Sequence, residues 1–356
     1  MKLGIIGLPS SGKTTIFNAL TRGDAPVGQS VSGRFDVLTS VVDVPDERVG
    51  ILTAMFKPEK TAYAKVIYTD IAGLKKGIGE SGGMSGPLLN HLAALDGFVH
   101  VVRAFANDQV AHLEDTIDPA RDLATLDTEF LLSDLVLVET RLTRLKEGLN
   151  KSKDKVATQR DIALMEQLHA KLSEERPLRE LDLTEEEEKS LRGFGFLTLK
   201  PVLVLINVGD EQADVPLTYT FGKSRVLNLR GRLEAELAQL SGDDLEMFMT
   251  EYGVTELGLA KVIHESYDLM GLQSFFTVGE DEVRAWTVAR GASAVDAAAT
   301  IHTDLAKGFI RAEVVAYADL IELGSMANAR SQGKLRQEGK TYIVQDGDIV
   351  HIKFNL

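Results

Sequence analysis

The stretch Leu3-Gly-Ile-Ile-Gly-Leu-Pro-Ser-Ser-Gly-Lys-Thr-Thr15 decides the fold, because it joins a short apolar run to a glycine-rich turn and the start of a helix. Gly7 and Gly12 bracket four residues, and Lys13 follows directly. Glycines let backbone N–H groups converge on an anion, and a helix N-terminus adds positive potential at the same point. The spacing predicts a phosphate-binding loop, with an ordinary glycine-rich turn as the alternative.

The residue types in this loop assign individual roles. The Lys13 ammonium group is predicted to neutralise the β and γ phosphates as a catalytic residue, and the Thr14 hydroxyl is predicted to hold Mg²⁺. The residues expected to bind the nucleotide here are Pro9, Ser10, Ser11, Gly12, Lys13, Thr14 and Thr15.

A second motif follows the strand predicted over residues 64–70. Asp70 ends this strand and Gly73 comes three residues later, which fits a carboxylate in the Mg²⁺ shell and a glycine N–H that meets the γ-phosphate. The glycine-rich segment after Gly73 is expected to change conformation when the γ-phosphate leaves. Leu74 stands where many GTPases carry a glutamine that orients the attacking water, and leucine has no polar group for that task.

A buried strand is predicted over residues 96–105, and two histidines lie in or after it. His100 sits between valines and is interpreted as a packed core residue. His112 lies on less regular chain and could reach a site. Periodicity alone gives neither histidine a catalytic role.

The strand predicted over residues 201–207 ends in a segment that is expected to bind the base. Asn207-Val208-Gly209-Asp210 would place an asparagine that braces the loop and an acid that accepts hydrogen bonds from a purine. A last strand over 225–229 and helices to about Leu272 are expected to finish this domain. Residues 24–45 are interpreted as a polar loop, and residues 46–59 as an amphipathic helix.

Composition limits the classes of protein to consider. The 356 residues are 44% hydrophobic and 26% charged, which is ordinary for a globular protein. No run approaches the roughly 20 apolar residues that cross a bilayer, and no cleavable leader is recognised, so a cytoplasmic location without a membrane partner is expected. The absence of cysteine excludes a thiol nucleophile. A net charge of −14 argues against a surface devoted to nucleic acid and against sequence-specific DNA binding, although a local basic patch remains open.

A helical segment is predicted after Asp118-Pro119. Apolar residues recur every three or four positions on either side of a break at 148–152, which predicts two antiparallel helices, either coiled-coil-like or an ordinary packed layer. Thr184 is predicted to cap a short helix that begins with the acidic run 185–188.

The last 83 residues favour a compact sheet with one packed helix over 293–302. The predicted strands are 275–278, 283–288, 311–316, 342–344 and 349–354. Asp346-Gly347 between the last two predicts a hairpin, because this dipeptide accepts positive φ angles. The expected class is α/β. We expect a P-loop NTPase domain in two parts (1–115 and 200–273), a helical coiled-coil insertion (116–199) and a C-terminal domain (274–356).

The chain resembles the Obg-like ATPases called YchF, within the translation-factor class of P-loop NTPases. The resemblance rests on five stretches: Gly7 to Leu20, Asp70 to Gly77, Leu272 to Gly279, Glu282 to Thr287 and Ile301 to Glu313. It spans nearly the whole chain and implies a ubiquitin-like (β-grasp) TGS fold for the C-terminal domain.

The resemblance also implies site roles and partners. Members carry a hydrophobic residue at the position of Leu74, and a histidine that matches His112 is their proposed water-positioning residue. The ribosome is implied as a partner. Three positions depart from the family pattern: Arg34 replaces a switch threonine, Asp210 replaces a glutamate that goes with ATP use, and Arg230-Gly231 replaces the small pair that lines the base.

Three functions therefore stand as hypotheses. The first is a Mg²⁺-dependent ATPase, with GTP as an alternative substrate, that associates reversibly with ribosomes. The second is a nucleotide-gated scaffold with little hydrolysis, motivated by Arg34 and Leu74. The third is an Obg-like GTPase that prefers GTP through Asp210, the acid that guanine-specific proteins use.

Overall fold

The computed structural model describes residues 1–23, 37–71, 74, 86–108, 110, 112, 116–251 and 257–355. The expectations for Gly73, Arg34 and the glycine-rich segment 75–85 fall outside these residues. The chain forms two compact units, the first from residues 1–41 and 67–262 and the second from residues 42–66 and 263–356. Among the described residues, no helix is both long and apolar enough to span a membrane.

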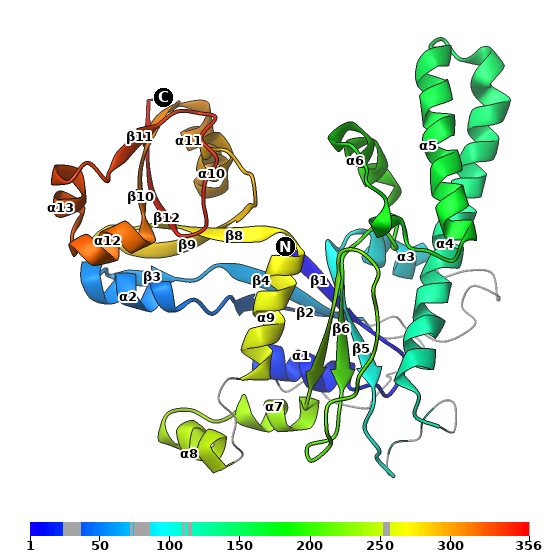
Figure 1. Cartoon of the computed structure of the whole chain (residues 1–356), viewed down its shortest axis with the longest axis horizontal. Helices are drawn as coiled ribbons and strands as arrows, with labels where there is room; N and C mark the ends of the chain where they lie inside the picture. The colour runs from blue at the N-terminus through cyan, green and yellow to red at the C-terminus, as the bar shows by residue number, and fades with distance from the viewer. Residues whose placement is uncertain are drawn as a thin grey trace. The chain divides into compact units, whose positions relative to one another are not determined.

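The first unit is built on a six-stranded sheet in the order β2-β4-β1-β5-β6-β7 (Figure 1). Its strands are β1 (Lys2–Ile6), β2 (Val37–Asp43), β4 (Lys65–Ile71), β5 (Gly97–Arg103), β6 (Val202–Asn207) and β7 (Ser224–Leu229). β1 pairs in parallel with β4 and β5, and β6 pairs in parallel with β5 and β7. β5 and β6 are buried along their whole length, as their unbroken apolar runs predict. The carboxyl ends of five strands therefore meet at one edge of the sheet.

Helices lie between and after the strands of this sheet along the chain. They are α1 (Lys13–Thr21), α3 (Gly86–Ala93), α4 (Pro119–Gly148), α5 (Lys155–Ser173), α6 (Glu185–Leu191), α7 (Gly231–Leu237), α8 (Asp243–Glu251) and α9 (Gly258–Leu269). Short 3₁₀ turns lie at Leu149–Lys151, Leu178–Glu180 and Arg192–Phe194. The predicted cap of α6 is confirmed, because Thr184 and Glu187 form a capping box.

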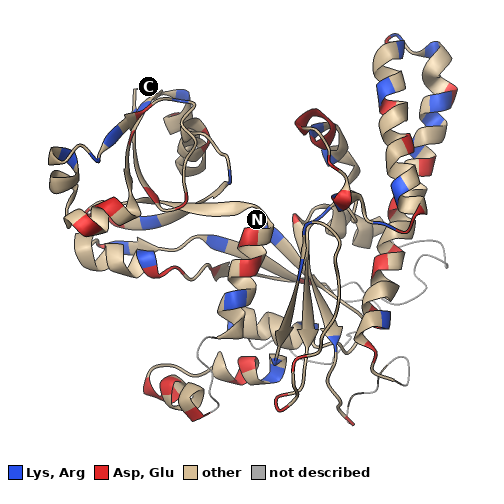
Figure 2. Ribbon diagram, in the orientation of Figure 1, with Lys and Arg blue, Asp and Glu red and all other residues tan. Residues whose placement is uncertain are grey.

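α4 and α5 form the predicted antiparallel hairpin, with the break at the 3₁₀ turn Leu149–Lys151 (Figure 1). Their apolar seam includes Val138, Met165 and Leu168, and all three are buried. Acidic and basic residues are interspersed along both helices (Figure 2), and Lys146 pairs with Glu166 across the hairpin at 2.8 Å. Such mixed charge on the outside and an apolar seam inside is the pattern of a short antiparallel coiled coil.

The second unit contains its own six-stranded sheet in the order β11-β10-β12-β8-β9-β3. Its strands are β3 (Lys60–Ala62), β8 (Leu272–Thr277), β9 (Glu282–Ala289), β10 (Phe309–Ala316), β11 (Arg336–Glu338) and β12 (Asp348–Phe354). Its helices are α2 (Glu47–Phe56), α10 (Ala294–Ile301), α11 (Thr303–Lys307), α12 (Tyr317–Leu323) and α13 (Met326–Ser331). α10 packs on one sheet face through Ala297 and Ala298, which lie in a core with Phe275 and Val314. The expected sheet with a packed helix is therefore present.

Two local predictions were wrong. The segment 24–45 was expected to be loop, yet residues 37–43 form β2. Exposed and buried positions do not alternate regularly along this strand, so its sequence carries no clear strand pattern. Residues 342–344 are not a strand and make one isolated bridge, between Ile343 and Ser293. The Asp346-Gly347 turn does exist, with Gly347 at φ +86°, but it leads into β12, which pairs with β10 and β8.

Residues 42–66 belong to the second unit, although they precede most of the first in sequence. β3 pairs in parallel with β9, with Lys60 opposite Glu282. In α2, the Arg48 guanidinium bonds Asp346 at 2.8 Å and lies over the Phe276 ring. The division into 1–115, 116–199, 200–273 and 274–356 stays a prediction, and these compact units differ from it at residues 42–66 and 263–273.

Asp134 is a buried carboxylate that ties α4 to the chain that returns to β6. Its oxygens accept the backbone N–H of Leu197 at 2.9 Å and of Thr198 at 2.7 Å, and the Thr198 hydroxyl donates at 2.7 Å. Burial raises the pKa of Asp134 to about 6, and these three hydrogen bonds act in the opposite direction. Asp134 thereby holds α4 to the chain before β6, in addition to the apolar packing of Leu126 and Phe130 of α4 against the sheet.

We expect Asp134→Ala to lower the free energy of unfolding by about 3 kcal/mol, because two buried backbone N–H groups lose their acceptor. Urea denaturation followed by circular dichroism measures this change. Asp161→Ala serves as the control, since the Asp161 side chain is 51% exposed on α5. Equal stability of the two variants would contradict the anchoring role.

Candidate functional site

The loop between β1 and α1 has a backbone that only permissive residues adopt readily. Gly7 has φ +149°, Ser10 φ +63° and Gly12 φ +95°. Space is equally restrictive: a Cβ on residue 7 would lie 2.3 Å from Val101 O, and one on residue 12 would lie 2.2 Å from Asn207 Nδ2. The two glycines of the motif are therefore required by both conformation and packing.

Three side chains that the sequence assigned to phosphate and metal meet at the start of α1. Lys13 Nζ donates to Leu8 O at 2.9 Å, inside the loop. Thr14 Oγ1 donates to Asp70 Oδ2 at 2.8 Å, which joins α1 to the end of β4. Burial lowers the pKa of Lys13 to about 8 against the opposing effect of Asp70, and burial raises the pKa of Asp70.

Two oxygen atoms at this point lack hydrogen-bond partners among the described residues. They are Asp70 Oδ1 and Ser11 Oγ, and both are buried. Buried polar atoms are usually paired, so an unpaired carboxylate oxygen next to a threonine hydroxyl marks a place for a ligand. An all-oxygen donor pair of this kind suits a hard cation such as Mg²⁺. In the described part of the chain, no three His, Cys, Asp or Glu side chains are grouped so that they could hold a metal ion by themselves.

Asn207 connects the phosphate loop to the segment expected to bind the base. Its Nδ2 donates to Ser11 O at 3.0 Å, and its Oδ1 accepts from Gly231 N at 3.1 Å. Asn207 lies at the end of β6 and Gly231 begins α7, directly after β7. A Cβ on residue 231 would lie 2.7 Å from Asn207 Oδ1, so the small residue permits this contact. The predicted bracing role of Asn207 thus has a matching geometry.

Two arginines surround Asp210 in the base segment. Arg230 donates to Asp210 O at 3.2 Å and to Gln212 O at 3.0 Å. Arg232 Nε lies 3.3 Å from Asp210 Oδ2, and Asp210 Oδ1 is buried without a partner among the described residues. One carboxylate oxygen of Asp210 is therefore paired and the other is unpaired. Val208 is buried behind this segment.

Leu74 packs in the hydrophobic core of the first unit, where it is 1% exposed. Its neighbours in that cluster include Ile71, Leu88 and Leu92. A leucine side chain in this position contacts apolar groups and has no atom that could form a hydrogen bond with a water molecule at a phosphate. The residue that would orient such a water must come from another segment.

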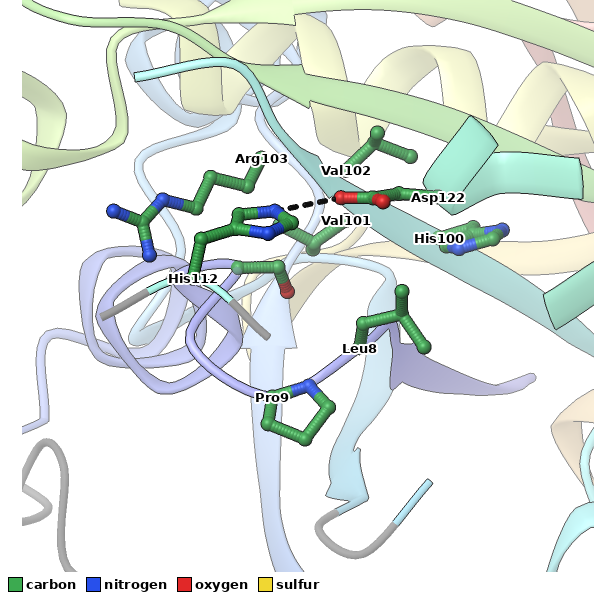
Figure 3. A pocket seen from close by; sticks show the side chains of 9 residues that line it. Leu8, Pro9, His100, Val101, Val102, Arg103, His112 and Asp122 are labelled. Atoms are coloured by element: carbon green, nitrogen blue, oxygen red, sulfur yellow. Dashed lines mark hydrogen bonds and ion pairs between the residues drawn. The ribbon is translucent and has the colours of Figure 1, made fainter. Parts of the chain in front are cut away.

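A small pocket beside the phosphate loop brings the two histidines of the sequence analysis to one place (Figure 3). His112 Nε2 lies 2.9 Å from Asp122 Oδ2, and Figure 3 shows the ring beside Arg103. His100 is buried on β5, and burial lowers its pKa to about 3, so it is neutral as expected of a core residue. The pocket is lined by Leu8, Pro9, Ser11, His100, Val101, Val102, Arg103, His112 and Asp122.

The predicted residues with described positions come together along the carboxyl edge of the first sheet. The loop follows β1, Asp70 ends β4, Asn207 ends β6, and Arg230 follows β7. Gly73 lies outside the described residues. The sequence analysis missed Asp122, because an acid in the first turn of a helix is common there for electrostatic reasons alone.

A parallel sheet with this strand order and a glycine loop at the start of α1 defines a P-loop nucleotide-binding protein. Comparison with known families agrees. Residues 2–141 match the MMR_HSR1 family, described as "50S ribosome-binding GTPase". Residues 272–355 match the YchF-GTPase_C family, described as "Protein of unknown function (DUF933)".

Relatives match along the full length. The chain is 40% identical to "Ribosome-binding ATPase YchF" of Bacillus subtilis, over 99% of each chain. It is 37% identical to "Obg-like ATPase 1" of Caenorhabditis elegans, over 100% of this chain and 92% of the relative. The solved YchF GTPase of Schizosaccharomyces pombe superposes with a TM-score of 0.84 at 29% identity, over 99% of this chain and 97% of that one. The chain belongs to the YchF family, as its motifs predicted.

We expect Gly12→Ala to weaken nucleotide binding by at least tenfold, because the added methyl group displaces Asn207 and strains a backbone at positive φ, at about 1–3 kcal/mol. Titration with a fluorescent nucleotide analogue measures this change. The control is Gly50→Ala in α2, where a Cβ has no heavy atom within 4 Å. Its nucleotide affinity should equal that of the wild type, and a loss as large as that of Gly12→Ala would contradict the explanation.

Proposed function

We propose that this chain is a Mg²⁺-dependent ATPase that hydrolyses the β–γ bond slowly and associates with ribosomes in the cytoplasm. The single observation that carries the proposal is the arrangement of Lys13, Thr14 and Asp70 at the start of α1, where one buried Asp70 oxygen has no partner among the residues that the structure describes. Relatives over the full length bear the name "Ribosome-binding ATPase YchF", which supports the same activity and partner.

The phosphate loop provides the binding chemistry. Its backbone N–H groups and the N-terminus of α1 would hold the phosphates, and Lys13 would exchange the Leu8 carbonyl for phosphate oxygens. Thr14 and Asp70 would hold Mg²⁺, which neutralises charge on the β and γ phosphates when bound. The remaining contacts are proposed for Pro9, Ser10, Ser11, Gly12, Thr15 and Gly73.

His112 is proposed to position the attacking water. Leu74 is buried in the core and has no polar atom, so the position that holds glutamine in many GTPases is excluded from this role. His112 lies in the pocket that Pro9 and Ser11 of the phosphate loop help to line. A histidine can accept a hydrogen bond from water at neutral pH, which suits the task.

The base would lie against Asn207, Val208, Asp210, Arg230 and Gly231. The names of relatives differ on the nucleotide, since both ATPase and GTPase occur among them. Within the described part of the chain, one Asp210 oxygen has no partner and Arg232 occupies the other, whereas a guanine base needs both oxygens for its two adjacent N–H groups. This pairing supports ATP over GTP. Titrations of both nucleotides with and without Mg²⁺ decide between the ATPase and the GTPase hypotheses.

We propose that the second unit contributes to ribosome binding through basic side chains. Arg311 on β10 lies directly opposite Lys353 on β12, and like charges in such a pair destabilise a sheet. One carboxylate, Glu313, lies 3.6 Å from Lys353 and 3.8 Å from Arg330. The basic side chains here outnumber this carboxylate, and their repulsion lowers the stability of the folded state. An anionic partner such as ribosomal RNA would explain such an excess of positive charge. Further basic residues proposed to contribute are Lys307, Lys334, Arg336 and Lys340.

For the ATPase activity, we expect Lys13→Ala to reduce phosphate release from ATP about 100-fold or more, because the γ-phosphate loses its main cationic partner. Lys155→Ala, an exposed lysine on α5, is the matched control and should behave as the wild type. Turnover that survives in Lys13→Ala would refute the ATPase. Tight nucleotide binding by the wild type with no phosphate release, with or without ribosomes, would instead favour the nucleotide-gated scaffold that the buried Leu74 suggests.

For the ribosome contact, we expect the double variant Arg311→Glu/Lys353→Glu to co-sediment with ribosomes more weakly than the wild type, with a smaller dependence on salt. Charge reversal at both positions turns attraction to phosphate into repulsion. Lys60→Glu on β3 of the same unit is the control, because the Lys60 side chain is also exposed, at 69%. Co-sedimentation that is equal for all three proteins would remove this surface from the contact.

A further inference from the structure

The free end of the α4–α5 hairpin is basic in a chain that is acidic overall. Residues 144–160, here called the hairpin tip, contain six basic and two acidic residues, a net charge of +4, whereas the whole chain carries −14. All six basic residues are exposed, and Figure 2 shows Lys and Arg at this end of the hairpin. They are Arg144, Lys146, Lys151, Lys153, Lys155 and Arg160.

Ion pairs do not neutralise this charge. Lys146 is paired with Glu166 at 2.8 Å. Within the described part of the chain, no ion pair joins any of the other five basic residues of the tip to a carboxylate. Of the two acids in the tip, Asp154 accepts a hydrogen bond from Ala157 N at 2.9 Å and thereby caps α5. The tip therefore presents an excess of positive charge to its surroundings.

The turn that carries the central lysines has a defined shape. Ser152 N donates to Leu149 O at 3.3 Å, and Ser152 Oγ donates to Asp154 O at 3.0 Å. The same hydroxyl lies 2.7 Å from Thr158 Oγ1 in α5. Lys151, Lys153 and Lys155 therefore leave a backbone that is already ordered, and less conformational entropy is lost when they meet a partner.

The length of the hairpin separates the tip from the acidic body. Asp134 ties α4 to the chain before β6, and from Asp134 to Leu149 the helix rises by about 22 Å, at about 1.5 Å per residue. Salt at physiological concentration screens electrostatic interactions over about 8 Å. A polyanion at the tip is therefore repelled only weakly by the body, so the net charge of −14 does not prevent its binding there.

We propose that the hairpin tip binds the phosphate backbone of RNA, which gives the proposed association with ribosomes a contact surface in the first unit and rests on that association. Lys and Arg side chains neutralise phosphates and release counterions, whatever the base sequence. The tip contains no aromatic residue on which a base could stack. The contact therefore holds the chain on RNA without reading its sequence.

The test variant is Lys151→Gln/Lys153→Gln/Lys155→Gln in the full chain, with a short RNA duplex of arbitrary sequence as the probe. By fluorescence anisotropy at several salt concentrations, we expect its affinity to fall at least tenfold near physiological salt. The slope of log Kd against log salt should become smaller by about 2–3, since each phosphate contact on a double helix contributes about 0.9. Two duplexes of unrelated sequence should bind the wild type equally well.

The fold and the nucleotide site should be unaffected in this variant. Lys and Gln have similar helix propensities, so the circular dichroism spectrum should match that of the wild type. ATP hydrolysis without ribosomes should also be unchanged, because the tip lies outside the nucleotide site.

The matched control is Lys189→Gln/Arg192→Gln/Lys223→Gln, which changes the net charge of the chain by the same amount. These three residues are also exposed and belong to the first unit, but Lys189 lies 3.9 Å from Glu185 and Lys223 lies 3.6 Å from Glu188. The control should keep wild-type affinity for the duplex. An equal loss in the control would show that net charge alone governs binding, and it would overturn the tip as a site. Equal RNA affinity of the wild type and the tip variant would overturn it too, as would a preference for one duplex sequence.

Co-sedimentation of the same proteins with ribosomes separates this proposal from the proposed function. Equal co-sedimentation of the wild type and the tip variant overturns the tip contact and leaves the association with ribosomes intact. A wild type that does not co-sediment overturns that association, whereas weaker duplex binding by the tip variant would still support RNA as the partner of the tip. Binding of the wild type to vesicles that contain phosphatidylserine, without binding to RNA, would assign the tip to a membrane surface and overturn the proposal.

Discussion

The close approach of three chain segments at the phosphate loop is the constraint on which the rest of the structure depends. Residue 7 faces the carbonyl of Val101 on β5, and residue 12 faces the amide of Asn207 on β6, at distances that exclude a Cβ in both cases. The loop can therefore be compact only where the parallel strands deliver their carboxyl ends side by side. The sheet and the phosphate loop therefore depend on each other, because a shift in the register of the strands would remove both of these close approaches.

Burial of charge is the second consequence of this compactness. The loop holds an ammonium group whose pKa is lowered to about 8 and faces a carboxylate whose pKa is raised, and burial is the main cause of both shifts. Groups that are partly desolvated before a ligand binds interact more strongly with phosphate and metal once they meet them. In the structure, Lys13 donates a hydrogen bond to the Leu8 carbonyl, and Thr14 donates one to a carboxylate oxygen of Asp70. These internal bonds keep the site assembled and are of the kind that a ligand can replace.

The sequence was enough to place a residue in the fold where its local pattern and the strand topology indicate the same position. Asp70 and Asn207 could be placed at the site because each ends an apolar strand, and parallel strands must align those ends. The sequence was insufficient where tertiary pairing decides. β2 has too little apolar alternation to be recognised, and residues 342–344 have a strand-like composition but lack a neighbouring strand with which to form a ladder. Asp122 was missed because its partner is a loop residue ten positions earlier, at a spacing that no motif records.

The burial of Leu74 is the structural reason why we propose a histidine from another segment as the residue that orients water. At the end of β4 the chain contributes one hydrophobic residue to the core cluster around Leu88 and Leu92, which ties the start of that segment to α3. A polar residue there could orient water only at the expense of this packing. The connection between β5 and α4 is held by two contacts. Arg103 donates a hydrogen bond to Val110 O, and His112 pairs with Asp122. In the proposed function, the orientation of water therefore falls to the segment after β5 and not to the one after β4. Both follow strands that flank β1, so both can reach the same phosphate.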